Sequence, residues 1–322
     1  MSGPYAYAGA ASHTGIAKEV AFGVPVLPSA RIPFIENSLR FSPGLFFPFF
    51  ATFLREQYVN PLVGSYKFTG ALNTYLYPTN AIELLVAGIG QDTVTGSGPL
   101  YTHTITAGTV LPSLTIEKAL GNYQSEQYAG CQVGSLSIAS SVSGDPVRLN
   151  CEIAAQSAQI LDPPSSVPLV IDEDPFVFRE GTITVLGGAV GATIQNVELR
   201  IDNYTYTAYV YGQLNNPAII TPTSRTVRGS FDVSWLSLND STYGWWSKMA
   251  NMASGTLSVT WAKADGTSVN FYCPNMVIHD LNDNIDPNNL VGQHLTFDGY
   301  YDILNDLPSI TATIVNAVAE PY

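Results

Sequence analysis

Short runs in which apolar and polar residues alternate dominate this chain and predict strands. In the first half, the runs lie at residues 32–41, 66–76, 101–105, 114–119, 128–142 and 147–155. In the second half, they lie at residues 194–203, 227–236, 256–262, 269–279 and 294–303. Alternation with a period of two puts successive side chains on opposite faces of a sheet. The pattern therefore predicts an all-β protein.

Two segments instead predict short helices. Residues 80–88 (NAIELLVAG) carry Asn80 as an N-cap and end at Gly88, which stops a helix. Residues 243–252 (YGWWSKMANM) predict the other helix. Each predicted helix follows the second strand of its half, so each half is expected to be a β-barrel or β-sandwich with a flanking helix.

The composition along the chain predicts its division into parts. Residues 1–30 are rich in Gly, Ala, Ser and Pro, which indicates an extended arm that becomes ordered only against a partner surface. Four prolines between residues 161 and 175 indicate a connection. We expect a first β-domain at 31–160, a linker at 161–190 and a second β-domain at 191–322.

The two predicted domains share an order of elements. YKFTGALNTYL aligns with TVRGSFDVSWL, and LTIEKA aligns with LSVTWA. In this alignment Gly70 matches Gly229 and Leu114 matches Leu257, while the strand of Cys131 matches the strand of Cys273. Internal duplication of one antiparallel β-domain explains the shared order. The alternative is two unrelated β-domains with a similar spacing of strands.

Charge and length limit the possible functions. The 322 residues suffice for two ordinary domains, and the net charge of −13 is scattered rather than collected in a tail. Tight binding of nucleic acid needs clustered Lys and Arg, so it is not expected. The apolar run at 45–54 is interrupted by Pro48 and is too short to cross a bilayer. The N-terminus lacks the pattern of a signal peptide, which favours a reduced, cytosolic environment.

The sequence contains no familiar catalytic pattern. G-x-S-x-G, H-E-x-x-H, the P-loop and G-x-G-x-x-G are absent. The three cysteines have no zinc-like spacing, so we expect buried free thiols. In HDLNDNIDPNN, alternating oxygen ligands from Asp280 to Asp286 fit either the start of a calcium loop or a solvated turn. A non-enzymatic protein without a cofactor or resident metal is expected.

An aromatic run is the most informative apolar feature. Residues 45–54 read LFFPFFATFL, at a place between two strands where a hairpin loop is normally polar. The run is buried either within the subunit or against a neighbouring subunit. The candidate contact residues are Phe46, Phe47, Phe49 and Phe50.

The order of several motifs resembles that of one family. AFGVPVLPSARIPFIENSL is followed by LLVAGIG, YTHTIT, LPSLTIEK and YAGCQVGSLSI, and later by ELRIDN, TVRGSFDVSW and CPNMVIHDL. Taken together, residues 19 to 303 resemble the tail tube proteins of long-tailed bacteriophages. The individual motifs are short, so the resemblance rests on their joint order.

The resemblance implies a role in the virion tail. Such proteins form stacked homo-oligomeric rings whose sheets join into one inner barrel through which DNA passes during ejection. It implies assembly in the host cytoplasm with other tail proteins, such as the tape measure and terminator proteins, and no membrane. Two β-domains per chain imply three copies per ring with approximate sixfold symmetry. The alternative is six copies with the second domain projecting outward.

Strand alternation selects candidate residues for the inner wall. In ELRID, Glu198, Arg200 and Asp202 share one face and Leu199 and Ile201 share the other. Glu198 and Asp202 are therefore expected at the lumen or at a contact between subunits, with Arg200 partly neutralising them. By the same reasoning Glu152 and Asp232 are weaker candidates. A DNA conduit should have an acidic or neutral wall, because positive patches would trap the sliding polymer.

Two other classes of β protein remain open. An adhesin or pilus-like module would share the strand content and acidity, but it requires an export signal. A carbohydrate-binding β-sandwich requires exposed aromatic residues on one face, whereas the four tryptophans lie in strand or helix runs. Electron microscopy separates these classes from a tube, since only a tube protein gives rings or tubes.

Overall fold

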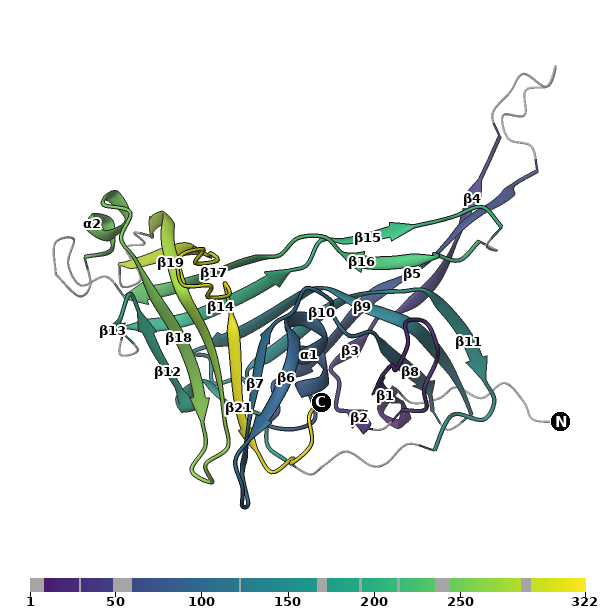
Figure 1. Ribbon diagram of the computed structural model, residues 1–322, viewed down its shortest axis with the longest axis horizontal. Coiled ribbons are helices and arrows are strands. Elements are labelled where there is room, and N and C mark those ends of the chain that lie inside the picture. The colour runs from purple at the N-terminus through teal and green to yellow at the C-terminus, as the bar shows by residue number, and fades with distance from the viewer. Residues whose placement is uncertain are drawn as a thin grey trace.

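The structure is a computed structural model, and it consists mostly of β-strands (Figure 1). It describes residues 9–28, 30–48, 60–121, 123–166, 173–190, 193–212, 215–234, 244–284 and 291–322. The prediction of an all-β protein with two short helices is confirmed. No helix in these ranges is long and apolar enough to cross a membrane.

A central antiparallel sheet runs through both halves of the chain. Its strand order is β4–β5–β10–β9–β14–β17–β20–β19. In that order, the bounds are Arg40–Phe46, Leu62–Tyr75, Arg148–Ala155, Gln124–Ser141, Ile194–Asp202, Thr226–Ser234, Gly292–Gly299 and Ser268–Asn284. The short strand β3 (Glu36–Asn37) also pairs with β5. The halves meet where β14 pairs with β9, from Asn196 opposite Ser141 to Asp202 opposite Ser135.

The long strands β9 and β19 extend beyond the central sheet and carry additional strands. The first half of β9 pairs with β8 (Leu114–Leu120) and β11 (Ser157–Leu161), and β8 continues to β1 (His13–Lys18) and β2 (Ala30–Ile32). The first half of β19 pairs with β18 (Ser254–Ala262) and β21 (Thr311–Asn316). From β18 the sheet continues to β12 (Gly181–Val185) and β13 (Gly188–Ala189).

Two hairpins and two 3-10 turns complete the fold. Strands β6 (Gly90–Thr95) and β7 (Tyr101–Ala107) pair with each other, and β7 also pairs with β21. Strands β15 (Thr205–Ala208) and β16 (Ile219–Pro222), which lie between β14 and β17 in the chain, form a separate two-stranded ribbon. The 3-10 turns are η1 (Gly9–Ala11) and η2 (Phe178–Glu180).

Both helices pack near the long strands. Helix α1 (Ile82–Ile89) contacts β9, and α2 (Trp245–Ala250) contacts β19. All of α1 except Glu83 is buried. A Cβ on Gly88 would lie 2.8 Å from a methyl carbon of Leu136 in β9, so glycine permits this close approach. Apolar side chains of the two halves belong to one hydrophobic core.

In several places the strands of the structure differ from those expected from the sequence. Residues 13–18, expected in a partner-dependent arm, form β1, because their backbone pairs with β8 and β2 within the same chain. Residues 181–185, expected in the linker, form β12 against β18. The segment 280–284, expected in a loop or turn, continues strand β19 beside β20. The strand predicted at 294–303 ends at Gly299.

Candidate functional site

One face of the central sheet is polar. Along β14 the residues Val197, Leu199 and Ile201 are buried, while Glu198 and Arg200 are exposed. The same alternation runs through the neighbouring strands. Residues opposite each other share a face, so the register defines the polar face. On the four strands β10, β9, β14 and β17 it comprises Arg148, Asn150, Glu152, Ser135, Ser137, Ala139, Ser141, Asn196, Glu198, Arg200, Asp202, Thr226, Arg228, Ser230, Asp232 and Ser234.

All four carboxylates singled out from the sequence lie on this polar face. Glu152 and Asp202 flank Ser135 from the two neighbouring strands, one in each half of the chain. Glu198 lies four residues before Asp202 on the same face of β14, as alternation predicted. Asp232 lies opposite Asn196 and receives a hydrogen bond from its Nδ2 at 2.7 Å.

Positive charges on the polar face have acidic neighbours. Arg200 Nε donates to Asp202 Oδ1 at 2.9 Å, which fits the expected partial neutralisation. The hydrogen bond to Asp202 also raises the pKa of Arg200. Arg228 lies 3.3 Å from a carboxylate oxygen of Asp298, and Arg148 lies 3.7 Å from one of Asp145. The face is therefore mixed in sign rather than a continuous basic stripe.

A hollow of about 480 Å³ lies on the polar face. It crosses β9, β14 and β17, where the side chains of Ala139, Ser141 and Ser230 are small. At its edge His294 Nδ1 lies 2.6 Å from Asp232 Oδ1. The hollow is open, and among the described residues that line it no hydrogen bond joins a serine hydroxyl to His294, so we assign it no chemistry.

Two hairpins form an aromatic projection at one end of the molecule. Strands β4 and β5 extend away from the body (Figure 1), and Tyr209 and Asn215, which lie between β15 and β16 in the chain, contact β5. Tyr66 N donates to Asn215 O at 2.8 Å, and Tyr209 Oη donates to Tyr66 O at 2.7 Å. Phe46 and Phe47 are 61% and 46% exposed, so neither is buried within the subunit. Phe49 and Phe50 lie outside the described residues.

The second hairpin of this projection was not predicted from the sequence. Its tyrosines Tyr204, Tyr206 and Tyr211 are exposed. The sequence signal available was the density of Tyr residues between 204 and 211, but these residues follow the predicted strand 194–203 without a clear turn.

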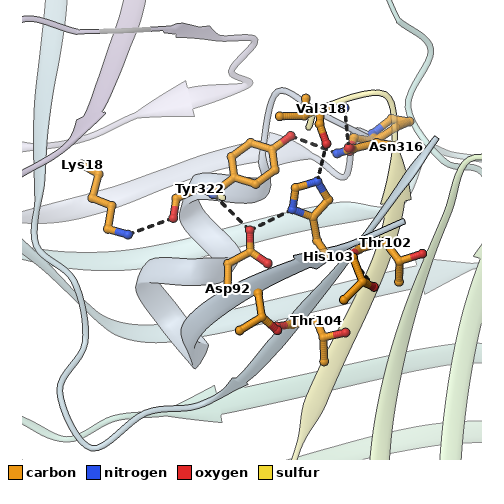
Figure 2. A network of polar contacts seen from close by, with 11 residues as sticks. Lys18, Asp92, Thr102, His103, Thr104, Asn316, Val318 and Tyr322 are labelled. Carbon is orange, nitrogen blue, oxygen red and sulfur yellow. Dashed lines mark hydrogen bonds and ion pairs between the residues drawn. The ribbon is translucent and has the colours of Figure 1, made fainter. Parts of the chain in front are cut away.

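A buried polar network connects the β6–β7 hairpin with residues near 320 (Figure 2). His103 Nδ1 lies 2.8 Å from Asp92 Oδ2, and both side chains are fully buried. His103 Nε2 donates to Val318 O at 3.0 Å, and Tyr322 N donates to Asp92 Oδ2 at 3.0 Å. Lys18 Nζ donates to Tyr322 O at 2.9 Å. Both ring nitrogens of His103 are occupied and closed to solvent, so the network holds the fold together and is no open acid-base pair.

The cysteines are buried free thiols, as predicted. Burial raises the pKa of Cys151 and of Cys273 to about 12 and also raises that of Cys131, so none is a reactive thiolate at neutral pH. Within the described residues, no group of three or more His, Cys, Asp or Glu could hold a metal ion. Asp280 and Asn282 lie on strand β19, and Asp286 lies outside the described residues.

The fold and its surfaces define a class of protein: an all-β structural protein with one continuous sheet, a mixed polar face and an exposed aromatic projection. A family model described as phage tail tube protein matches residues 9–299, and the chain belongs to this family. The resemblance identified from the sequence is thereby confirmed, and the protein is a structural component of a phage tail. A comparison with curated proteins found no match.

Proposed function

We propose that three copies of this chain close into a ring with approximate sixfold symmetry, and that the rings stack into a tube through which DNA is ejected. The pairing of β14 with β9 carries this proposal. It places strands of both halves side by side in one sheet. A ring of three chains then contains six equivalent groups of strands, two from each chain, and its sheet must continue from one group to the next. A second domain that projects outward from a hexameric ring would not continue the sheet of the first.

The order of strands in the two halves supports internal duplication. The first half contributes β4, β5, β10 and β9 to the central sheet, and the second contributes β14, β17, β20 and β19 in the same relative order. The added strands also correspond, since β2–β1–β8 flank β9 as β13–β12–β18 flank β19. Helices α1 and α2 precede β8 and β18 in the chain, although the hairpin β6–β7 lies between α1 and β8. We therefore treat residues 31–160 and 191–322 as two copies of one domain, with β1 and β12 as further members.

We assign the polar face of the central sheet to the inner wall. The opposite face is covered by α1, α2 and the apolar core, so the polar face is the one left for solvent or DNA. Glu152, Glu198, Asp202 and Asp232 then contribute carboxylates to the wall. Their basic neighbours reduce the net charge, which gives a wall near neutral that repels phosphate weakly and does not trap it.

The aromatic projection is assigned to contacts between subunits of successive rings. Exposed Phe46 and Phe47 supply apolar area that a monomer leaves in water. Rings at the two ends of the tube would instead meet the other tail proteins, such as the tape measure and terminator proteins.

Electron microscopy and native mass spectrometry of the purified chain test this function. We expect rings or tubes, and a ring mass of three chains. Six chains per ring with peripheral lobes would support the alternative arrangement. Dispersed monomers at concentrations where tail proteins assemble would contradict the proposed function.

A further inference from the structure

The central sheet ends in two strand edges that have no partner in the described part of the chain. Strand β4 pairs on one side only, with β5. Beyond Val277, strand β19 also pairs on one side only, with β20. Arg40, Phe41 and Ser42 are exposed at the first edge, and the side chain of Asp280 is exposed at the second. Unpaired edges of this kind are templates for another strand.

The contact between the halves provides an internal template for joining such edges. Strand β14 occupies in the second half the place that β4 occupies in the first, and β14 is paired with β9. Two crowded glycines fix the correspondence. Leu199 lies opposite Gly229, and a Cβ on Gly70 would lie 2.6 Å from the backbone nitrogen of Leu39. Leu39 therefore corresponds to Leu199.

The same glycines align the next strands. Gly70 lies opposite Ile153 in β10, and Gly229 lies opposite Phe297 in β20. Ile153 and Phe297 therefore correspond. A residue of β10 then corresponds to the residue of β20 that lies the same number of positions from Phe297 as the first lies from Ile153.

The correspondence then passes to β9 and β19. Three residues before Ile153, Asn150 lies opposite Ser137 in β9. Three residues before Phe297, His294 lies opposite Asn282 in β19. Ser137 therefore corresponds to Asn282.

Transferring the β14–β9 register gives a defined joint between two chains. In that register Ile201 lies opposite Leu136. Building on the ring assembly proposed above, we propose that β4 of a second copy pairs antiparallel with the free edge of β19, with Phe41 opposite Leu281. Arg40 then lies opposite Asn282, and Ser42 lies opposite Asp280.

The hydrogen bonds of the template show which backbone groups face outward. Asn203 N donates to Gly134 O at 2.8 Å, so odd-numbered residues of β14 bond to β9. Phe41 is at such a position, and its N–H and C=O point toward the free edge. Pro43 corresponds to Asn203 and has no N–H to donate, so it ends the pairing of β4.

The edge of β19 has the matching donor. Leu281 N donates to Asp280 Oδ1 at 3.0 Å rather than to a strand. The carbonyl of Phe41 would replace this side-chain acceptor. Leu281 lies opposite Leu295 on the apolar face of the sheet and is half-buried, so it would pack against Phe41.

Side chains at the proposed joint are complementary. Phe41 is 47% exposed and stacks on Phe68 with ring centroids 5.3 Å apart, so one side of its ring is covered by its own subunit. Arg40 and Asp280 lie on the polar face at diagonal positions of the joint, within reach of each other. Opposite charges at this distance attract and therefore favour the joint, while the register itself rests on the β14–β9 template.

Disulfide trapping in the full chain tests the register. Residues opposite each other at non-hydrogen-bonded positions have Cβ atoms about 4.5–5.5 Å apart, whereas diagonal pairs are about 7–8 Å apart. The matched pair is Ser42→Cys with Asp280→Cys, and the mismatched control is Ser42→Cys with Asn282→Cys. The three native thiols are buried and do not compete. Assembled matched variants should form covalent links between chains at least about tenfold faster than the control under mild oxidation.

The outcomes separate this inference from the proposed function. Rings or tubes in which the matched pair reacts no faster than the control would contradict the joint and leave the tube function intact. A wild-type chain that does not assemble would contradict both. If the cysteine variants fail to assemble, a density map of wild-type rings decides, since it must show Leu281 of one copy beside Phe41 of the next.

Discussion

Arg225 Nε donates to Asn203 Oδ1 at 3.2 Å, and the two residues, both from the second half of the chain, cap the end of helix α1 in the first. Arg225 Nη2 donates to Ile89 O at 2.6 Å, and Asn203 Nδ2 donates to Gly88 O at 2.9 Å. The last carbonyls of a helix lack partners within the helix. The second half therefore supplies the cap that the first half needs.

We expect Arg225→Leu to destabilise the chain by about 2–4 kcal/mol, because it leaves the buried carbonyl of Ile89 without its donor. Urea unfolding measures the change. Arg228→Leu is the matched control, since Arg228 lies exposed on the polar face and its loss should cost within about 0.5 kcal/mol. Equal losses for both variants would contradict a role of Arg225 in joining the halves.

The paired glycines should be equally intolerant of a side chain. A Cβ at Gly70 would lie 2.5 Å from Ser38 O, and one at Gly229 would lie 2.4 Å from Glu198 O. We expect Gly70→Ala and Gly229→Ala each to cost about 2–3 kcal/mol, because neighbouring strands must move apart. Gly292→Ala in β20 is the control, since its Cβ would meet only an ordinary contact at 3.7 Å. Thermal unfolding distinguishes the outcomes, and a tolerated Gly229→Ala would refute the equivalence.

Reversing charge on the polar face should change how assembled tubes treat DNA. We expect Glu152→Lys with Glu198→Lys to leave folding intact and to make tubes retain double-stranded DNA in low salt, with release as salt rises. Wild-type tubes should retain none. Asp306→Lys with Glu320→Lys, outside the central sheet, is the control. Retention by the control alone would argue that the polar face is not the inner wall.

The buried thiols predict a fall in stability in alkali. In the folded chain, burial raises the pKa of Cys151 and Cys273 to about 12, from an ordinary value of 9.0. Above pH 9 the unfolded chain loses thiol protons that the folded chain keeps, so the free energy of unfolding decreases as pH rises from 9 toward 12. At pH 10 the loss is roughly 1 kcal/mol for each thiol. The free energy of unfolding, measured with urea, should differ between pH 8 and pH 10 by that much less in Cys151→Ala than in the wild type. An unchanged difference would show that this thiol ionises as easily in the folded chain.

The sequence by itself determined the class of fold, the two short helices and the faces of the individual strands. Alternation in ELRID assigned Leu199 and Ile201 to the core and Glu198 and Asp202 to the opposite face, and the structure agrees. A period of two is a local property of an extended backbone, so a single strand suffices to reveal it. The family was also accessible, because the motifs keep their order along the chain.

Only the tertiary structure decided which strands are neighbours. Strand β1 was missed because its residues HTGIAK carry no clear alternation, and the segment becomes a strand by pairing with β8. The gathering of Glu152 and Asp202 around Ser135 was equally hidden, since 50 residues of sequence separate strands β10 and β14 at these positions. Hydrogen bonds between strands are non-local, and the sequence of one strand does not specify which other strand it pairs with. The pairing of β9 with β14 therefore decided that both halves of the chain build one continuous sheet.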